Sequence, residues 1–367
     1  MENNSKYYWN SINTGYKNYP FLSSNEKCDV VVIGGGISGC LTAYYLSQYN
    51  LNTILLEKNF IAQGNASTST GILETTADIE INKLSKLIGK KDAFYAHMLC
   101  EKAVDDIEYI LYNINLSHIL EKKDMLYSIN NEHAKNGAIK DVHRHSYSKK
   151  CVLVDPFKLC HGLLRSSQKK HAKIYENTAA IGFESYTNTL RINTNTSHYI
   201  ECKKIVFTNG LSINNILPLK NLIDIKNINT IVTTPLRDCL DILNKNYLLN
   251  YNNDYTYIRS TCDKRIMISS FNSDSNLHTN EKLLELFKNT YEYSKNLEVE
   301  YSFTAPYGES IDGLPYIGAH PKLENCYLNL ALGRNHICYS AIGAQIIRDL
   351  ILYNTSPYED LFAFKRN

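Results

Sequence analysis

Residues 29–40 read DVVVIGGGISGC, and this stretch decides the fold. A continuous apolar run leads straight into a glycine-rich turn, which is typical of a parallel strand buried on both faces. The pattern then predicts a helix over about residues 38–48 and a second strand, NTILLEK, over 52–58. Together these segments predict a strand–helix–strand unit of about thirty residues.

The glycines of this turn have the spacing of a dinucleotide-binding fingerprint. Gly34 permits the tight turn, Gly36 lets the backbone approach a pyrophosphate, and Gly39 lets the helix pack on the strand. The unpaired N–H groups at the start of the helix, at Ile37 and Ser38, offer partial positive charge to phosphates. The fingerprint therefore predicts a dinucleotide, but it does not distinguish FAD from NAD.

The end of the second strand narrows the choice of nucleotide. Glu57, followed by Lys58, is placed to accept a hydrogen bond from a ribose hydroxyl, and a carboxylate there would repel a 2′-phosphate, which disfavours NADP. Small-residue or glycine-containing segments follow at GNASTSTG (64–71), IVFTNG (205–210) and ALGRNHICYSAIGAQIIRDLI (331–351). An extended cofactor that crosses several strand ends needs such pieces, so the sequence favours FAD.

Composition excludes several other classes of function. The 367 residues carry a net charge of +2, with 44% hydrophobic and 21% charged residues, which gives no support for a nucleic-acid or anionic-membrane partner. The ten cysteines form no CxxC pair and no zinc-spaced cluster, so we expect no metal site and no disulfide framework. Neither a signal-peptide pattern nor an apolar run long enough to cross a bilayer is present, and the expected location is cytoplasmic.

The remaining segments predict an α/β protein of two interleaved domains. Helices are expected over about 80–113, after a turn at Pro156, over about 280–296, and from Gly333 to Tyr353. Short strands over about 172–210 are expected to form an antiparallel ribbon and then a return to the main sheet, and further strands are expected at 228–233, 255–260 and 265–270. We assign 1–78, 150–215 and 305–367 to a discontinuous FAD-binding domain, and 79–149 and 216–304 to a substrate domain.

Ordered motifs along nearly the whole chain resemble the D-amino-acid-oxidase-like (DAO) superfamily of FAD-dependent oxidoreductases, of the glycine oxidase, sarcosine oxidase and D-amino acid dehydrogenase type. They are DVVVIGGGISGCLTAYYLSQYNLNTILLEK, GNASTSTG, VDPFKLCHGLL, IYENTAAI, IVFTNG, YTYIRSTCDKRIMIS, YGESIDGLPYIG and GRNHICYSAIGAQIIRDLIL. The resemblance implies a Rossmann-like FAD-binding domain interleaved with a substrate domain of mixed β-sheet and helices.

The resemblance also assigns positions along the cofactor. Members that attach flavin covalently use a cysteine shortly before the DGLP signature, and EYSFTAPYGES has none, so we expect noncovalent FAD. Beyond the fingerprint, the matching positions are Ser67, Ser69, Thr70 and Gly71 along the pyrophosphate, ribityl chain and flavin, Ala180 at adenine, Thr208 and Gly210 near the ADP, Asp312 and Gly313 beside the cofactor, and Gly333, Arg334, Asn335, His336 and Ile337 at the pyrimidine edge of the flavin.

The implied reaction is oxidation of a C–N bond in a small amine or amino acid, by hydride transfer to flavin N5. Arg259 matches the Tyr-x-Arg position of the substrate domain and is a candidate clamp for a substrate carboxylate; the alternative is a surface ion pair. Tyr257 is a candidate hydroxyl donor. The electron acceptor, either O₂ or a carrier, stays open.

The chain departs from the family pattern at the last turn. The family commonly has Gly-Gly-Asn-Gly where this chain has GRNH. Arg334 either stabilises anionic reduced flavin or points to solvent, and His336 either bonds substrate or flavin or caps the last helix. The stretches ISSFNSD and ILETTADIE also depart from the pattern. Two further functions therefore stay open: a related flavoenzyme acting on a 2-hydroxy acid, glycerol phosphate or modified nucleoside, and a flavin-binding protein with little activity.

Overall fold

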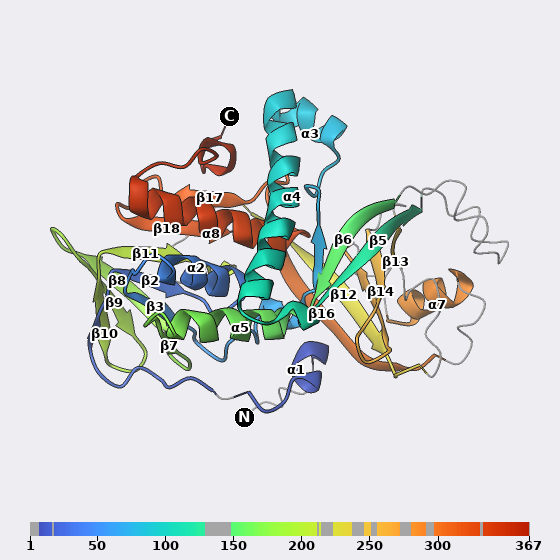
Figure 1. Ribbon diagram of the computed structural model, residues 1–367, viewed down its shortest axis with the longest axis horizontal. Coiled ribbons are helices and arrows are strands. Elements are labelled where there is room, and N and C mark those ends of the chain that lie inside the picture. The colour runs from blue at the N-terminus through green and yellow to red at the C-terminus, as the bar shows by residue number, and fades with distance from the viewer. Residues whose placement is uncertain are drawn as a thin grey trace.

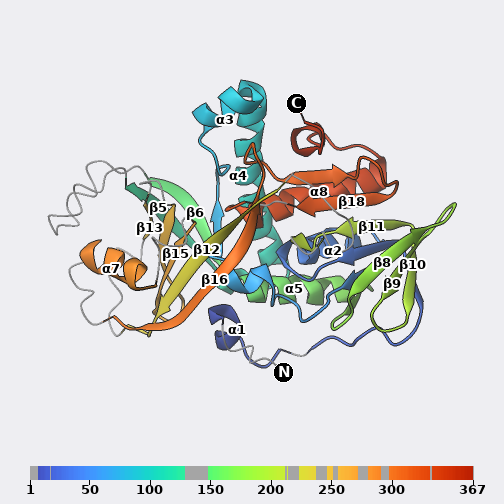
Figure 2. The same cartoon turned by 180° about the vertical axis from the view of Figure 1, so that it is seen from behind.

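The computed structural model describes residues 7–16, 18–128, 148–210, 213, 223–236, 246–250, 255–271, 280–290, 297–330 and 333–366. Within these ranges the chain builds two large sheets side by side, with helix α4 (Lys90–Asn113) standing between them (Figures 1 and 2). Segments from the start, middle and end of the chain contribute to the first sheet, so the predicted interleaving is present.

The first sheet has six strands in the order β17-β18-β11-β2-β3-β7. Five of them are parallel, and β17 pairs antiparallel at one edge. This arrangement is the parallel sheet that the fingerprint predicts. Its strands are β2 (Val30–Ile33), β3 (Thr53–Leu56), β7 (Lys173–Tyr175), β11 (Lys204–Phe207), β17 (Tyr316–Ala319) and β18 (Cys326–Leu330).

Both faces of this sheet are covered, which explains why β2 is apolar throughout. Val30 and Val32 pack into the core that includes helices α2 (Ile37–Ser47), α5 (Pro156–Gln168) and α8 (His336–Tyr353). Val31 and Ile33 pack on the opposite face, against an antiparallel ribbon. The ribbon has the order β1-β10-β9-β8 and consists of β1 (Glu26–Lys27), β8 (Ala180–Ser185), β9 (Leu190–Thr194) and β10 (Tyr199–Cys202).

The second sheet has eight strands in the order β16-β12-β15-β14-β13-β5-β6-β4. Ile258 of β14 packs with Leu283 of helix α7 (Asn280–Thr290) on one face, while Tyr257 packs with Ile72 and Phe271 on the other. The strands are β4 (Ile72–Glu74), β5 (Leu120–Ser128), β6 (Ser148–Val154), β12 (Asp224–Thr233), β13 (Asn246–Asn250), β14 (Thr256–Ser260), β15 (Ile266–Ser270) and β16 (Val299–Glu309).

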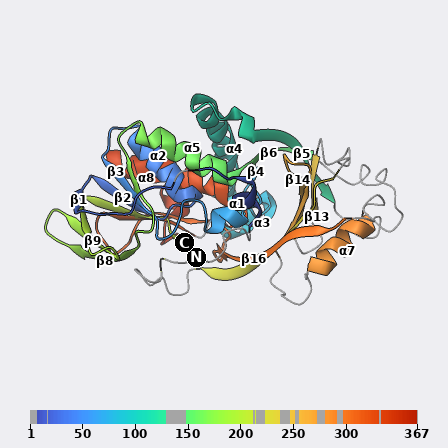
Figure 3. The same ribbon diagram turned by 90° about the horizontal axis from the view of Figure 1, so that it is seen from below.

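The described residues also form α-helices α3 and α1. Helix α3 (Ile81–Ile88) packs against α4 at the end that stands away from the sheets (Figure 1). Helix α1 (Tyr8–Ile12) lies near the middle of the molecule, where the two sheets meet (Figures 1 and 3). No helix within the described ranges is both long and apolar enough to cross a membrane.

The α/β fold is confirmed. Pro156 was expected in a turn, but it is the first residue of α5, because Asp155 caps the helix by accepting from the Lys158 N–H at 3.0 Å. Helix α7 ends at Thr290, and the rest of the helix expected to 296 falls on 291–296, outside the described residues. The domain boundaries stay a prediction; β4, β6 and β16, whose residues fall within or across the ranges given to the FAD-binding domain, all join the second sheet.

Candidate active site

The glycine-rich turn after β2 has the geometry that a pyrophosphate requires. Gly34 has φ +114°, and a Cβ on Gly39 would lie 1.8 Å from the Gly34 carbonyl oxygen, so neither position tolerates a side chain. A Cβ on Gly36 would meet nothing within 4 Å. Helix α2 therefore begins with an open approach to its first N–H groups, at Ile37 and Ser38, and no side chain caps it.

The turn after β11 lies against these glycines. Thr208 donates from Oγ1 to the carbonyl oxygens of Ile33 (2.9 Å) and Gly34 (3.2 Å), and Gly210 has φ +52°. The side-chain oxygen of Asn209 is buried and has no hydrogen-bond partner. An orphaned polar atom beside an uncapped helix start fits a bound dinucleotide.

Glu57 lies at the end of β3, next to the segment that leads to Ala180. The Glu57 carboxylate accepts from the N–H of Gly35 (2.7 Å) and of Asn59 (2.9 Å), and a carboxylate has lone pairs left for a ribose hydroxyl. The backbone N–H of Thr178 donates to the Glu57 carbonyl at 2.9 Å. The structure thus brings Glu57 close to the start of β8, whereas the Lys58 side chain is exposed.

The segment 67–71 is buried and held mainly by backbone contacts. Ser67 Oγ donates to the carbonyl of Gly64 at 2.7 Å, and Thr70 is 4% exposed. Gly71 has φ +66°, and a Cβ on it would lie 2.3 Å from the Val154 carbonyl oxygen. The segment is therefore fixed, and it runs toward the start of α8.

The turn before α8 is organised by Asp78, a residue that sequence reasoning missed. Its carboxylate accepts from the backbone N–H of Arg334 (2.6 Å) and of Asn335 (2.9 Å). A Cβ on Gly333 would lie 2.1 Å from Asp78 Oδ2, which explains the glycine there. The Asn335 amide donates to the Glu74 carbonyl at 2.8 Å. Burial raises the pKa of Asp78.

Arg334 lies inside the molecule, with its side chain 8% exposed, which excludes the alternative that it points to solvent. The guanidinium carbon is 3.7 Å from the centre of the Tyr255 ring, Nη2 donates to the Asp78 carbonyl, and Nη1 is 3.8 Å from Glu309 Oε1. Burial alone lowers the pKa of Arg334, but the nearby Asp78 carboxylate raises it overall. Arg334 is therefore cationic, and it connects the turn before α8 to Tyr255 and to Glu309 of β16 in the second sheet.

His336 uses both ring nitrogens inside the protein. Nδ1 is 3.1 Å from the Arg334 carbonyl and must donate to it, since that oxygen can only accept. Burial lowers the pKa of His336, so the neutral ring then accepts at Nε2 from Ser69 Oγ, 2.8 Å away. Ser69 Oγ in turn accepts from the Gly71 N–H at 3.1 Å. These contacts support the structural alternative for His336; Ile337 beside it is fully buried.

Tyr257 and Arg259 project from the same face of β14, toward segment 70–74. The Tyr257 hydroxyl donates to Glu74 Oε1 at 2.7 Å, and burial together with the charge of Glu74 raises its pKa well above its usual value. Arg259 is 5% exposed and donates from Nη1 to the Thr70 carbonyl at 2.7 Å. The surface ion pair considered as the alternative role for Arg259 is excluded by this burial.

Asp312 is engaged with the C-terminal part of the chain. Its carboxylate pairs with Arg366 through Nε (2.5 Å) and Nη2 (2.7 Å). Burial raises the pKa of Asp312, but Arg366 lowers it overall. Gly313 has φ +73°, and a Cβ there would lie 2.4 Å from Ile79 Cδ1. These contacts hold the turn in shape, and the predicted place of Asp312 and Gly313 beside the cofactor stays a prediction.

Among the described residues, no group of three or more His, Cys, Asp or Glu side chains is placed to hold a metal ion. The nine cysteines within the described ranges are all free thiols. The residues that sequence reasoning missed are Trp9, Glu74, Asp78, Tyr255 and Glu309. Glu74 and Asp78 carried a signal as acidic residues in the segment that departs from the family pattern, and Tyr255 and Glu309 lie in motifs of the resemblance. Trp9 lies outside all of these motifs.

Comparisons with known proteins agree with this geometry. A sequence profile of the DAO family, described as FAD dependent oxidoreductase, matches residues 29–350. Glycine oxidase of Bacillus subtilis (strain 168) is 23% identical over 381 residues, covering 92% of this chain and 96% of that protein.

Two solved structures are similar over most of the chain. L-amino acid deaminase from Proteus vulgaris, lacking its specific insertion, superposes with a TM-score of 0.77 at 16% identity, covering 96% of this chain and 97% of that one. L-proline dehydrogenase from P. horikoshii superposes with a TM-score of 0.74 at 17% identity, covering 93% and 99%. At such low identity these two structures establish a likeness of fold.

Proposed function

The chain belongs to the DAO family of FAD-dependent oxidoreductases, and from that premise we propose that it binds FAD noncovalently and oxidises the C–N bond of a small amino acid or amine. The proposal rests on the residues that lie together where the two sheets meet. There the turn before α8, segment 67–78 and strand β14 bring Arg334, Tyr255 and Tyr257 together, in a molecule whose glycine turn fits a pyrophosphate.

The cofactor residues fit FAD on observations of the chain itself. The open space at Gly36, the uncapped start of α2 and the orphaned oxygen of Asn209 suit a pyrophosphate, and Glu57 suits a ribose. FAD, when bound, supplies the acceptor for the hydride that leaves the substrate. We infer noncovalent binding because no cysteine precedes the DGLP signature in residues 300–310.

We assign the binding of a substrate carboxylate to Arg334. Among the described residues, Arg334 makes hydrogen bonds from its backbone N–H and from Nη2, both to Asp78. Nη1 lies 3.8 Å from Glu309 Oε1, an ion-pair contact longer than a hydrogen bond, so Nε and Nη1 keep donors for a ligand. The Tyr255 ring supports one face of the guanidinium. A fixed, always charged fork of this kind orients a carboxylate through two hydrogen bonds.

The other polar groups set the shape and charge around that arginine. Glu309 and Asp78 balance the charge of Arg334, and Tyr257 is fixed by its bond to Glu74. His336 stays neutral because burial lowers its pKa, so it adds no second cation. These residues bind and orient the substrate, and proximity of this kind contributes much of the rate in such reactions.

The test is anaerobic addition of amino acids, N-methyl amines and 2-hydroxy acids to the yellow protein, with flavin absorbance recorded. Bleaching by an amino acid or amine is the expected result. Bleaching by 2-hydroxy acids alone would mean that the substrate is a 2-hydroxy acid. A flavin that no compound reduces would indicate a flavin-binding protein with little activity. Acid precipitation tests whether the flavin is covalently attached to the protein. Noncovalent FAD goes into the supernatant, and covalent flavin stays in the pellet.

A further inference from the structure

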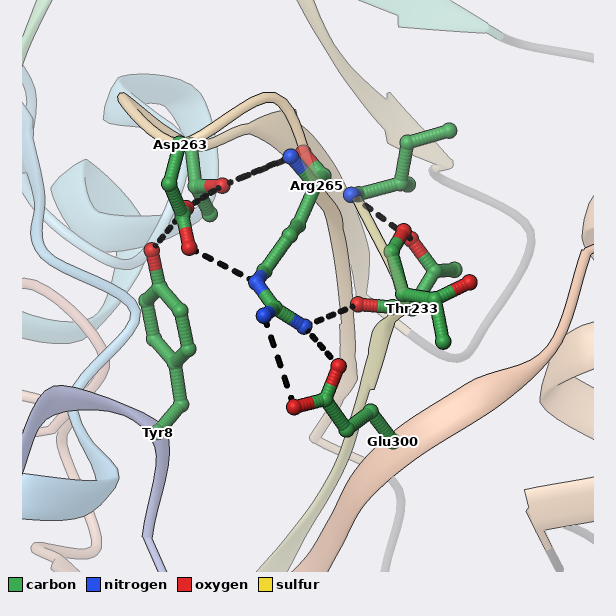
Figure 4. A network of polar contacts seen from close by, with 8 residues as sticks. Tyr8, Thr233, Asp263, Arg265 and Glu300 are labelled. Atoms are coloured by element: carbon green, nitrogen blue, oxygen red, sulfur yellow. Dashed lines mark hydrogen bonds and ion pairs between the residues drawn. The ribbon is translucent and has the colours of Figure 1, made fainter. Parts of the chain in front are cut away.

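The N-terminal helix α1 connects the two halves of the candidate site, although it precedes the first strand of the nucleotide-binding fold. Tyr8 and Trp9 are 0% and 2% exposed. The Tyr8 hydroxyl donates to Asp263 at 2.6 Å, in the turn between β14 and β15 (Figure 4), and Asp263 is in turn paired with Arg265. The indole N–H of Trp9 donates instead to the Ser69 carbonyl at 2.7 Å.

Arg259 reaches the same segment from β14. Its Nη1 donates to the carbonyl oxygens of Thr70 (2.7 Å) and Gly71 (3.3 Å), and its Nε donates to that of Ser260 (3.2 Å). The guanidinium carbon lies 5.6 Å from the Trp9 ring centre. Among the described residues, no carboxylate is within ion-pair distance of Arg259. Backbone carbonyl oxygens therefore take the place of a counter-ion for this buried cation.

Three consecutive carbonyl oxygens, those of Ser69, Thr70 and Gly71, are thus bound by two side chains from distant parts of the sequence. Ser69 also contacts the opposite side of the site, where its Oγ bonds His336 at the start of α8. A Cβ on Gly71 would lie 2.8 Å from Arg259 Nη1 and 3.3 Å from the Trp9 ring, so there is no room for a side chain at this position. The segment is held on both sides.

We propose that Trp9 and Arg259 are positioning residues of the FAD site: they fix the Ser69–Gly71 segment by its carbonyl oxygens, so that docking of the N-terminal helix and binding of FAD stabilise each other. This inference rests on the proposed function, and it replaces a substrate-clamp role for Arg259. Both residues act through the segment rather than on the substrate. If docking of α1 on this segment strengthens FAD binding, linkage requires FAD binding to strengthen the docking of α1 by the same factor.

Two conservative variants of neighbouring residues distinguish an effect on the FAD site from an effect on the stability of the whole protein. Trp9→Phe keeps an aromatic ring and removes the N–H that reaches Ser69, together with the second ring of the indole. Tyr8→Phe is the matched control, because it removes one hydrogen bond from the same buried helix, to Asp263, and leaves the Ser69–Gly71 segment untouched. The dissociation constant of FAD is measured on apoprotein by flavin fluorescence, without substrate, and thermal stability is recorded for both variants.

The expected result is that Trp9→Phe raises the FAD dissociation constant about tenfold, which corresponds to about 1.4 kcal/mol, and that Tyr8→Phe changes it by less than about twofold. Arg259→Lys keeps the charge but not the fork, and it is expected to raise the constant by at least as much as Trp9→Phe. Equal constants for wild type and Trp9→Phe would overturn the proposal, as would equal weakening by Trp9→Phe and Tyr8→Phe.

Trp9 provides an independent readout, since it is the chain's single tryptophan. The wavelength of its emission maximum is expected to shift when FAD is added to wild-type apoprotein and to Tyr8→Phe, whereas energy transfer to a bound flavin lowers only the intensity. An unchanged emission maximum, in a protein whose flavin fluorescence shows binding, overturns the coupling but leaves the proposed function intact. Absence of FAD binding by the wild type overturns both.

Discussion

Asp78 and Arg334, 256 residues apart in the chain, are joined twice: the Asp78 carboxylate accepts from the Arg334 N–H at 2.6 Å, and the Asp78 carbonyl accepts from the Arg334 guanidinium. The first contact fixes the turn before α8, and the second fixes the direction of the side chain. These contacts orient the Arg334 guanidinium over the Tyr255 ring, and a binding group that is already oriented loses less entropy when a ligand arrives.

Replacing Arg334 by Lys tests its assignment to the substrate carboxylate. The Lys ammonium is a point charge and cannot offer two parallel donors, so we expect KM for an amino acid to rise about 10²-fold, from the loss of roughly 2–3 kcal/mol of charge-assisted bonding. Steady-state kinetics with an amino acid and with the corresponding amine without a carboxylate measure this. KM for the amine is expected to change little.

Arg259→Lys is the matched comparison for that experiment. This variant is expected to change KM for the amino acid and KM for the amine by the same factor, when each variant is saturated with FAD. A selective rise of KM for the amino acid in Arg259→Lys, with none in Arg334→Lys, would return the clamp role to Arg259.

Replacing Asp78 by Asn is expected to destabilise the protein strongly. The change leaves the Arg334 guanidinium without its main counter-charge inside the protein, and breaking one side of a buried pair costs about 3–5 kcal/mol. The free energy of unfolding in urea at pH 7 gives the value. A loss well below about 1 kcal/mol would mean that water or another carboxylate compensates Arg334.

The glycine turn offers two alanine variants with different expected effects. A Cβ at Gly36 meets nothing within 4 Å, so Gly36→Ala is expected to leave the apoprotein stable and to weaken FAD binding by at least about tenfold, because the methyl group enters the path of the pyrophosphate. A Cβ at Gly39 would lie 1.8 Å from the Gly34 oxygen, so Gly39→Ala is expected to destabilise the apoprotein itself. FAD titration and thermal unfolding of the apoproteins check both, and equal stability loss in the two variants would contradict the assignment.

Local patterns in the sequence account for most of the fold. The apolar run of β2 and the glycines after it predict a buried strand and a helix start, because both depend on neighbours within about ten residues. The helical stripes over 80–113 likewise become α3 and α4. Such features follow from periodicity and backbone geometry alone.

The candidate site depends on contacts that no local pattern encodes. Asp78 contacts Arg334, and Trp9 contacts Ser69, only after the two sheets have come together. The sequence predicted a strand around Arg259, and β14 is that strand. The partners of Arg259, the carbonyls of residues 70 and 71, are backbone atoms without any sequence signature. The sequence alone therefore does not determine which groups these side chains contact.

Acid sensitivity is expected from His161, which α5 packs among the rings of Phe157, Tyr16 and Tyr19. Burial, assisted by the Arg165 cation, lowers the pKa of His161 from 6.5 to about 4. Between these values the unfolded chain binds a proton that the folded protein does not, so the free energy of unfolding falls as pH drops from about 6.5 toward 4. The contribution is on the order of 2–3 kcal/mol.

The variant His161→Gln removes this titration while keeping a polar side chain of similar length. Urea unfolding of wild type and variant at pH 7.5, 5.5 and 4.5 isolates the effect, because other groups that titrate, such as Asp and Glu, contribute equally to both proteins. The wild type should lose stability relative to the variant across this range. A constant difference between the two would mean that the folded protein admits the proton, and that the ring is not sealed under the N-terminal segment that carries Tyr16 and Tyr19.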